Sequence, residues 1–190
     1  MPGLSFREFL ILAKGKELEI ISLEDLLPHH RSITNDLLTD DWRPLPPLRE
    51  YWREGYYPIF LNEREGYAGR LNTIIQLVLE SDIPHIVETG NADYQSLGRL
   101  LYAVASSAPF KPNISKLAER LCIGRNTVLK CLELLERADL VSSLRQQAKG
   151  VAALAKPDKL YLNNTNLIYA LAPGAEHLGT VRETFFFNQL

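Results

Sequence analysis

The stretch LAERLCIGRNTVLKCLELLE, residues 117–136, carries polar and basic side chains at a spacing that suits nucleic-acid contact. It reads as a helix, a tight turn and a second helix. Arg125, Asn126, Thr127 and Lys130 fall at the start of that second helix. Such a helix enters the DNA major groove with its N-terminal end first, where arginine and asparagine can contact base edges. These four residues are therefore predicted to bind DNA.

Two further cations, Arg145 and Lys149, fall in the predicted wing and are suited to neutralising phosphates. Residues 94–162 hold 11 Lys or Arg and 5 Asp or Glu, a net charge of +6, while the remaining residues hold 10 and 18, a net charge of −8. Glu133 and Glu136 lie on the same helix and would repel phosphate. The pattern favours a basic DNA-binding module, and it leaves open a docking or hinge element of a larger assembly.

Two other groups of side chains resemble parts of metal sites. Glu183, with Lys159 upstream, fits one half of a metal-dependent nuclease centre, but one carboxylate cannot hold the metal alone. His29 and His30 match no strong ligand spacing and are expected in a solvated loop. No GxxxxGK[ST] loop, nucleophile elbow, HExxH or CxxC motif is present. We therefore predict no catalytic residue and no metal site in this chain.

The two cysteines and the chain's hydropathy indicate the compartment. Cys122 and Cys131 are predicted to be reduced, mostly buried thiols, which suits a cytoplasmic protein. The N-terminal MPGLSFREFL lacks the features of a signal peptide. No apolar run approaches the roughly 20 residues that a membrane span requires. We expect a cytoplasmic protein without a membrane segment.

The elements that position these side chains are mostly helices. Ser5 with Glu8, and Ser22 with Asp25, form predicted capping boxes. Ser115 and Asn126 are the predicted N-caps of the two helices around the turn. The predicted helices are 5–14, 22–28, 48–55, 64–81, 95–109, 116–121, 127–140 and two within 165–190; the predicted strands are 141–147 and 159–164, and 31–45 is a predicted loop.

Three helices followed by a β-hairpin are typical of a winged helix. The predicted fold is mainly α: a helical lid-like region, a winged helix-turn-helix with a small β-hairpin, and a short C-terminal segment. The corresponding domains are 1–93, 94–162 and 163–190. Because three phenylalanines, 185–187, lie close to the last residue, we expect the chain to be part of a longer protein.

Taken in order, several stretches resemble the C-terminal half of a family of prokaryotic AAA-type ATPases. They are LSFREFL, LREYWREGYYPIFL, SDI, ISKLAERLCIGRNTVLKCLELLERADLVSSL, KLYLNNTNL and GTVRETFFFNQL. In the lid turn Gly55 and Pro58 match, and Tyr56 replaces a second glycine. The later matches are Lys159, Tyr161, Leu167, Gly179, Glu183 and Leu190. Asn164 stands where the family has an acidic residue, and Asn166 where it has glycine.

The resemblance implies that a P-loop ATPase core, binding ATP and magnesium, precedes this segment in the full-length protein. The lid would transmit the nucleotide state to the winged helix, and Arg7, Arg64 or Arg70 would contact the nucleotide. The tail resembles a nuclease-like fold, whose metal binding the change at Asn164 puts in doubt. This chain alone is then no enzyme. The alternative is a free-standing winged-helix transcription regulator.

Overall fold

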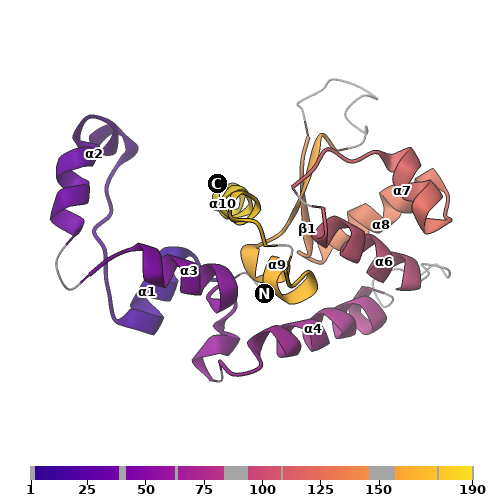
Figure 1. Cartoon of the computed structure of the whole chain (residues 1–190), viewed down its shortest axis with the longest axis horizontal. Helices are drawn as coiled ribbons and strands as arrows, with labels where there is room; N and C mark the ends of the chain where they lie inside the picture. The colour runs from indigo at the N-terminus through magenta and orange to yellow at the C-terminus, as the bar shows by residue number, and fades with distance from the viewer. Residues whose placement is uncertain are drawn as a thin grey trace. The chain divides into compact units, whose positions relative to one another are not determined.

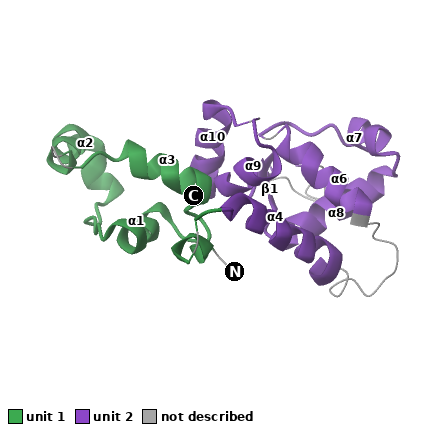
Figure 2. Cartoon of the chain, turned by 60° about the horizontal axis from the view of Figure 1, so that its bottom comes forward, with its two compact units in different colours: residues 1–65 green, residues 66–190 purple. Residues whose placement is uncertain are grey.

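The computed structural model describes residues 3–38, 42–62, 64–83, 94–107, 109–145, 157–174 and 176–189. These residues are mainly helical, with one two-stranded antiparallel hairpin, so the predicted fold class is confirmed. Contacts divide the chain into two units, Met1–Glu65 and Gly66–Leu190 (Figure 2). The functional division predicted at 93/94 and 162/163 stays a prediction.

The first unit contains α1 (Phe6–Lys14), α2 (Leu23–Leu37), α3 (Leu45–Glu54) and the short 3-10 helix η1 (Pro58–Leu61) (Figure 1). The predicted capping box at Ser5 and Glu8 is present, and Gly15 ends α1 with φ of 60°. Rings from α1, α3 and η1 form the core, with the Phe9 ring centroid 5.5 Å from Tyr51 and 5.2 Å from Phe60.

Helix α2 is longer than predicted. Ser22 accepts a hydrogen bond from Asp25 N as expected, but the helix continues through Pro28 to Leu37. Proline removes one backbone donor early in the helix, and the turns on either side keep their bonds. His29 and His30 therefore lie on a helix and not in a loop, although both are exposed.

The loop predicted at residues 31–45 is shorter in the structure, because the helices on either side of it extend into it. Its first residues belong to α2, and Pro46 falls at the start of α3, where a proline costs little because the first N–H groups of a helix have no intrahelical partner.

The second unit contains the remaining elements. They are α4 (Tyr67–Leu77), the π-helical turn η2 (Val78–Asp82), α6 (Tyr94–Ala105), α7 (Ile114–Leu121), α8 (Arg125–Arg137), β1 (Val141–Leu144), β2 (Lys159–Leu162), α9 (Thr165–Leu171) and α10 (Leu178–Asn188). Strands β1 and β2 pair antiparallel, from Val141 opposite Leu162 to Leu144 opposite Lys159. Phe110, between α6 and α7, adds an isolated antiparallel bridge to Leu160.

This bridge completes the winged-helix arrangement. The Phe110 and Leu160 backbones exchange two hydrogen bonds of 3.2 and 2.9 Å, so the segment between α6 and α7 borders the hairpin. The core beneath is apolar and comes from each element: Leu100 of α6, Leu117 of α7, Leu132 of α8 and Leu160 of β2 are buried. The predicted order of three helices and a hairpin is confirmed.

Both predicted caps around the turn are wrong by two residues. Asn113, not Ser115, caps α7, because its side chain accepts from Lys116 N at 3.1 Å. Gly124, not Asn126, is the N-cap of α8. Asn126 is therefore inside the first turn of α8, where its side chain is exposed and not used as a cap.

Helix α9 is fixed to α4 by polar contacts. The buried Tyr67 hydroxyl donates to Asn166 Oδ1 at 2.6 Å, and Asn72 Nδ2 donates to the Ala170 carbonyl at 2.9 Å. Asn164 caps α9 by accepting from Leu167 N. The two asparagines that depart from the resembled family pattern are thus buried structural residues in this chain.

Candidate nucleic-acid interface

The turn between α7 and α8 determines how α8 is presented. Cys122 adopts a left-handed conformation with φ of 55°, and its N–H bonds to carbonyl groups of α7, so α7 ends there. The next residues reverse the chain, and α8 begins at Arg125. Cys122 is exposed in this surface turn while Cys131 is buried, so the prediction that both thiols are mostly buried is wrong for Cys122.

Helix α8 separates an apolar side from a polar side. Val128, Leu132 and Leu135 are buried, as predicted from their spacing. Arg125, Asn126, Thr127 and Lys130, the four predicted DNA-binding residues of α8, are exposed. In the described part of the chain neither Arg125 nor Lys130 forms an ion pair.

The start of α8 also offers backbone donors. The first N–H groups of a helix lack intrahelical acceptors, and the helix dipole places partial positive charge there. Gly124 has no side chain that could accept from them. Because Arg125 lies at the same end, backbone and side chain together make this end suited to an anion such as phosphate.

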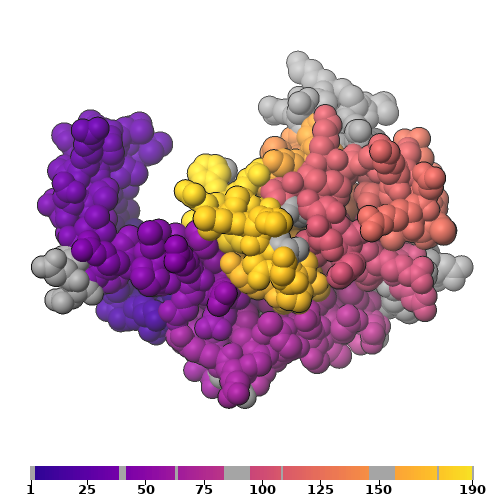
Figure 3. Space-filling model, viewed as in Figure 1, coloured from indigo at the N-terminus to yellow at the C-terminus, as the bar shows by residue number. Residues whose placement is uncertain are grey.

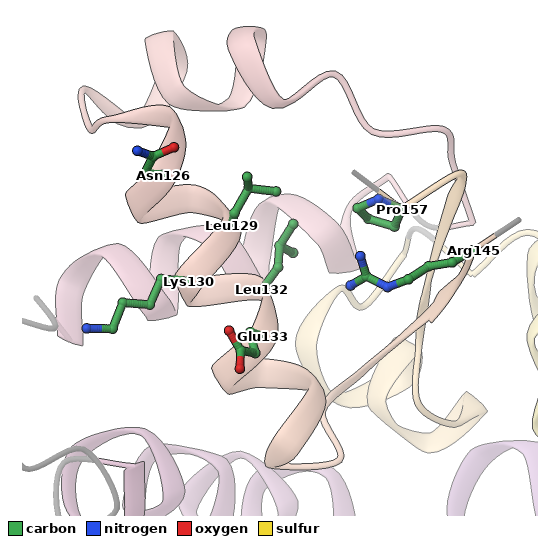
Figure 4. A pocket seen from close by; sticks show the side chains of 7 residues that line it. All are labelled: Asn126, Leu129, Lys130, Leu132, Glu133, Arg145 and Pro157. Carbon is green, nitrogen blue, oxygen red and sulfur yellow. The ribbon is translucent and has the colours of Figure 1, made fainter. Parts of the chain in front are cut away.

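A groove of about 500 Å³ lies between α8 and the end of the hairpin at which β1 stops and β2 starts. It is lined by Asn126, Leu129, Lys130, Leu132, Glu133, Arg145 and Pro157. Figure 4 shows the two leucines directed toward Pro157 and Arg145, whereas Lys130 extends away from Arg145. Three of the six predicted DNA-binding residues thus border one groove, which has an apolar floor and polar edges.

Arg145, at the base of the wing, is held by a carboxylate. Its Nη2 lies 3.1 Å from both Oε1 and Oε2 of Glu136, in the last turns of α8. This ion pair joins the hairpin to α8. Lys149, the sixth predicted residue, lies outside the described residues.

A lysine of β2 faces α10. Lys159 forms an ion pair with Glu183, and the hydroxyl of Tyr161 donates to the same carboxylate at 3.1 Å. The hydrogen bond to Glu183 raises the pKa of Lys159, while burial and then the same carboxylate raise the pKa of Tyr161. Lys159 is therefore protonated at neutral pH, and its charge is balanced by Glu183.

This pairing bears on the nuclease hypothesis for Glu183. Within the described ranges, no group of three or more His, Cys, Asp or Glu lies close enough to hold a metal ion. Glu183 and Lys159 instead contact each other across the interface between α10 and β2, where Tyr161 and Phe187 also stack with centroids 4.1 Å apart. The arrangement is that of a structural contact.

Two of the three arginines considered for nucleotide contact have partners in the first unit. Arg7 donates to the carbonyl oxygens of Leu18 and Glu19, and Arg64 pairs with Glu50. Arg70 is exposed on α4. Contact of one of these arginines with a nucleotide stays a prediction.

Sequence reasoning missed the part of the site that depends on tertiary structure. Leu129, Leu132 and Pro157 form the groove's apolar floor, yet their types indicate only a core. Glu136 was recognised as an unfavourable charge, but its pairing with Arg145 depends on how the hairpin returns to α8. No spacing rule joins these two residues.

The order α6–α7–α8–β1–β2, three helices followed by a two-stranded antiparallel hairpin, is that of a winged helix. The chain belongs to the family described as a domain of unknown function (DUF8612), which matches residues 45–178. It is also similar to the uncharacterized protein MJ1637 of Methanocaldococcus jannaschii, with 23% identity over 147 residues. That match covers 73% of this chain and 30% of the relative, so the chain spans about a third of the relative's length. No solved structure matches the chain significantly.

In the parts of the chain that the structure describes, none of the helices is long and apolar enough to cross a membrane.

Proposed function

We propose that the second unit binds DNA through α8 and the adjoining groove, with Arg125, Asn126, Thr127, Lys130 and Arg145 as the contacting residues. The observation that carries the proposal is the exposure of the first four of these at the start of α8, beside the groove. Arg125 and Lys130 would neutralise phosphates, and Asn126 is the residue suited to reading an adenine edge.

We further propose that this segment works within an AAA-type ATPase, as a lid and winged helix that respond to the nucleotide state of a core located in cis. The resemblance of the ordered motifs supports this, as does the greater length of the archaeal relative, of which the matched segment is 30%. ATP and magnesium would bind to that core. The isolated chain should not hydrolyse ATP, and turnover that is abolished by EDTA and survives further purification would contradict this.

The DNA proposal is tested by fluorescence anisotropy with a labelled duplex over a range of salt concentrations. Log affinity should fall linearly with log salt, and Arg125→Ala/Lys130→Ala should weaken binding and flatten that slope by up to about 1.8, or about 0.9 per lost phosphate contact. Arg49→Ala/Arg182→Ala removes the same charge from exposed positions outside the interface. It should leave the slope close to that of the wild type.

A second candidate function is favoured by the groove's floor. Leu129, which is partly exposed in the groove, offers apolar contact that a phosphate backbone does not use, so the groove is also suited to an apolar peptide. No DNA binding at low salt, with the circular dichroism spectrum of a folded helical protein, would reject the DNA proposal and make the winged helix a docking element.

A further inference from the structure

The ion pair between Arg145 and Glu136 carries an inference that rests on the proposed function. Arg145 follows β1 directly, and Glu136 is near the end of α8, so the pair spans the junction of groove and wing. Arg145 Nη2 donates to both oxygens of the carboxylate at 3.1 Å. The only wing arginine among the described residues is therefore already bound to an anion.

The Glu136 carboxylate is chemically similar to a DNA phosphate, the proposed ligand. A carboxylate and a phosphate both present two oxygens to a guanidinium group, and they can replace one another at the same donors. The pair is also accessible, because the side chains of Arg145 and Glu136 are 41% and 24% exposed. Pairs this exposed are weak, so an incoming phosphate can displace the glutamate.

We infer that Glu136 lowers the DNA affinity of the groove. It pairs with Arg145, and a DNA phosphate must displace it in order to bind that arginine. Glu136 is thus a positioning residue that acts through Arg145. Arg125 and Lys130, which form no ion pair in the described part of the chain, meet no such competition.

Replacement of Glu136 by a phosphate at Arg145 should be measurable in the salt dependence of the DNA affinity. Binding of a phosphate to an arginine without a protein partner releases a counterion from the DNA, and each such contact contributes about 0.9 to the slope of log affinity against log salt. When Arg145 leaves Glu136, the freed carboxylate attracts a cation again. The net ion release from this contact is therefore smaller in the wild type than in a variant that lacks the carboxylate.

The test uses Glu136→Gln, Arg145→Gln and the double variant in salt titrations with the same labelled duplex. Glu136→Gln should bind about threefold to fivefold more tightly at low salt. Its slope should be steeper than the wild type's by up to about 0.9. In the Arg145→Gln background, the factor by which Glu136→Gln increases the DNA affinity should be at least three times smaller than in the wild-type background.

Glu133→Gln is the matched control, because it removes one negative charge from the same groove at a residue that no ion pair joins to Arg145. Its effect should be the same with and without Arg145. A thermal melt of each variant establishes that the hairpin remains folded.

Each outcome decides the inference. A gain from Glu136→Gln that depends on Arg145 supports it. Weaker or unchanged binding by Glu136→Gln, or a gain that persists without Arg145, overturns it and leaves the DNA proposal standing if the wild type binds with a salt slope. Absence of binding by both wild type and Glu136→Gln overturns both proposals.

Discussion

At the scale of single residues, Asn113 determines where α7 begins. Its Oδ1 accepts from Lys116 N at 3.1 Å, whereas Ser115, the residue that sequence reasoning favoured, is exposed within the helix. Asparagine and serine are both good N-caps, so their types could not decide between them. The choice depends on the backbone of residue 113, which is extended, with φ of −104° and ψ of 96°.

Asn113→Ala should therefore destabilise the protein by about 1 kcal/mol, because it leaves a helix N–H without its side-chain acceptor. Ser115→Ala is the control and should change the free energy of unfolding by less than about 0.5 kcal/mol. Urea denaturation followed by circular dichroism measures both. Equal effects of the two substitutions would show that the cap is assigned to the wrong residue.

The residues of the candidate interface were easier to predict than its shape. The spacing of Val128, Leu132 and Leu135 fixes which side of α8 is buried, so the exposure of Arg125 and Lys130 follows from sequence. The groove could not be predicted, because it forms only where the hairpin returns alongside α8.

At the scale of elements, α10 packs on one face of β2. Lys159 and Tyr161 alternate along the strand and contact Glu183 and Phe187 of the helix. Just after the strand, the Asn163 carbonyl accepts from Asn188 Nδ2 at 2.9 Å. In the space-filling view, the yellow C-terminal segment adjoins the orange hairpin (Figure 3). This contact fixes the strand that carries one side of the wing.

The phenylalanines at the end of α10 provide a matched test of that contact. Phe187 stacks on Tyr161 with an interplanar angle of 5°, while Phe186 is 66% exposed. Phe187→Ala should destabilise the second unit by about 2–3 kcal/mol, through lost aromatic and apolar contact. Phe186→Ala should cost less than about 0.5 kcal/mol. Thermal melts by circular dichroism compare them, and a larger loss for Phe186→Ala would contradict the packing.

The lengths of elements were predicted well where end signals agree and poorly where they conflict. Ser5, Glu8 and Gly15 mark both ends of α1, and the prediction is confirmed. Pro28 was taken as the end of α2, but a proline in an early turn costs one hydrogen bond and does not outweigh the following helical turns.

At the scale of the whole molecule, the two units differ in tryptophan content, so that the first unit can be followed separately. Both tryptophans, Trp42 and Trp52, are in the first unit, so tryptophan fluorescence follows that unit alone. Glu50 in the same unit pairs with Lys14 and Arg64. Burial by itself would raise the pKa of Glu50, but hydrogen bonds and charges from these two partners outweigh it and lower that pKa.

Acid should therefore weaken the first unit. A carboxyl group whose pKa is lowered by folding stabilises the folded state above its unfolded pKa, near 4.5, and this contribution is lost as the pH falls through the lower folded pKa. Glu50→Gln should be less stable than the wild type at pH 7 by about 1 kcal/mol or less, and equally stable at the acid end.

Urea denaturation at several pH values, followed by tryptophan fluorescence, measures this difference. Glu17→Gln, an exposed position between α1 and α2, is the control and should follow the wild-type curve. A Glu50→Gln deficit that stays constant down to low pH would contradict the assigned role of the ion pairs.

The most direct test of the DNA-binding claim is a titration of the isotope-labelled chain with a short duplex, followed by backbone amide chemical shifts. The largest changes are expected on residues 124–133 and on Arg145, with little change in α1, α2 and α3. Saturable changes confined to the first unit or to the outer face of α10, with α8 unaffected, would contradict it.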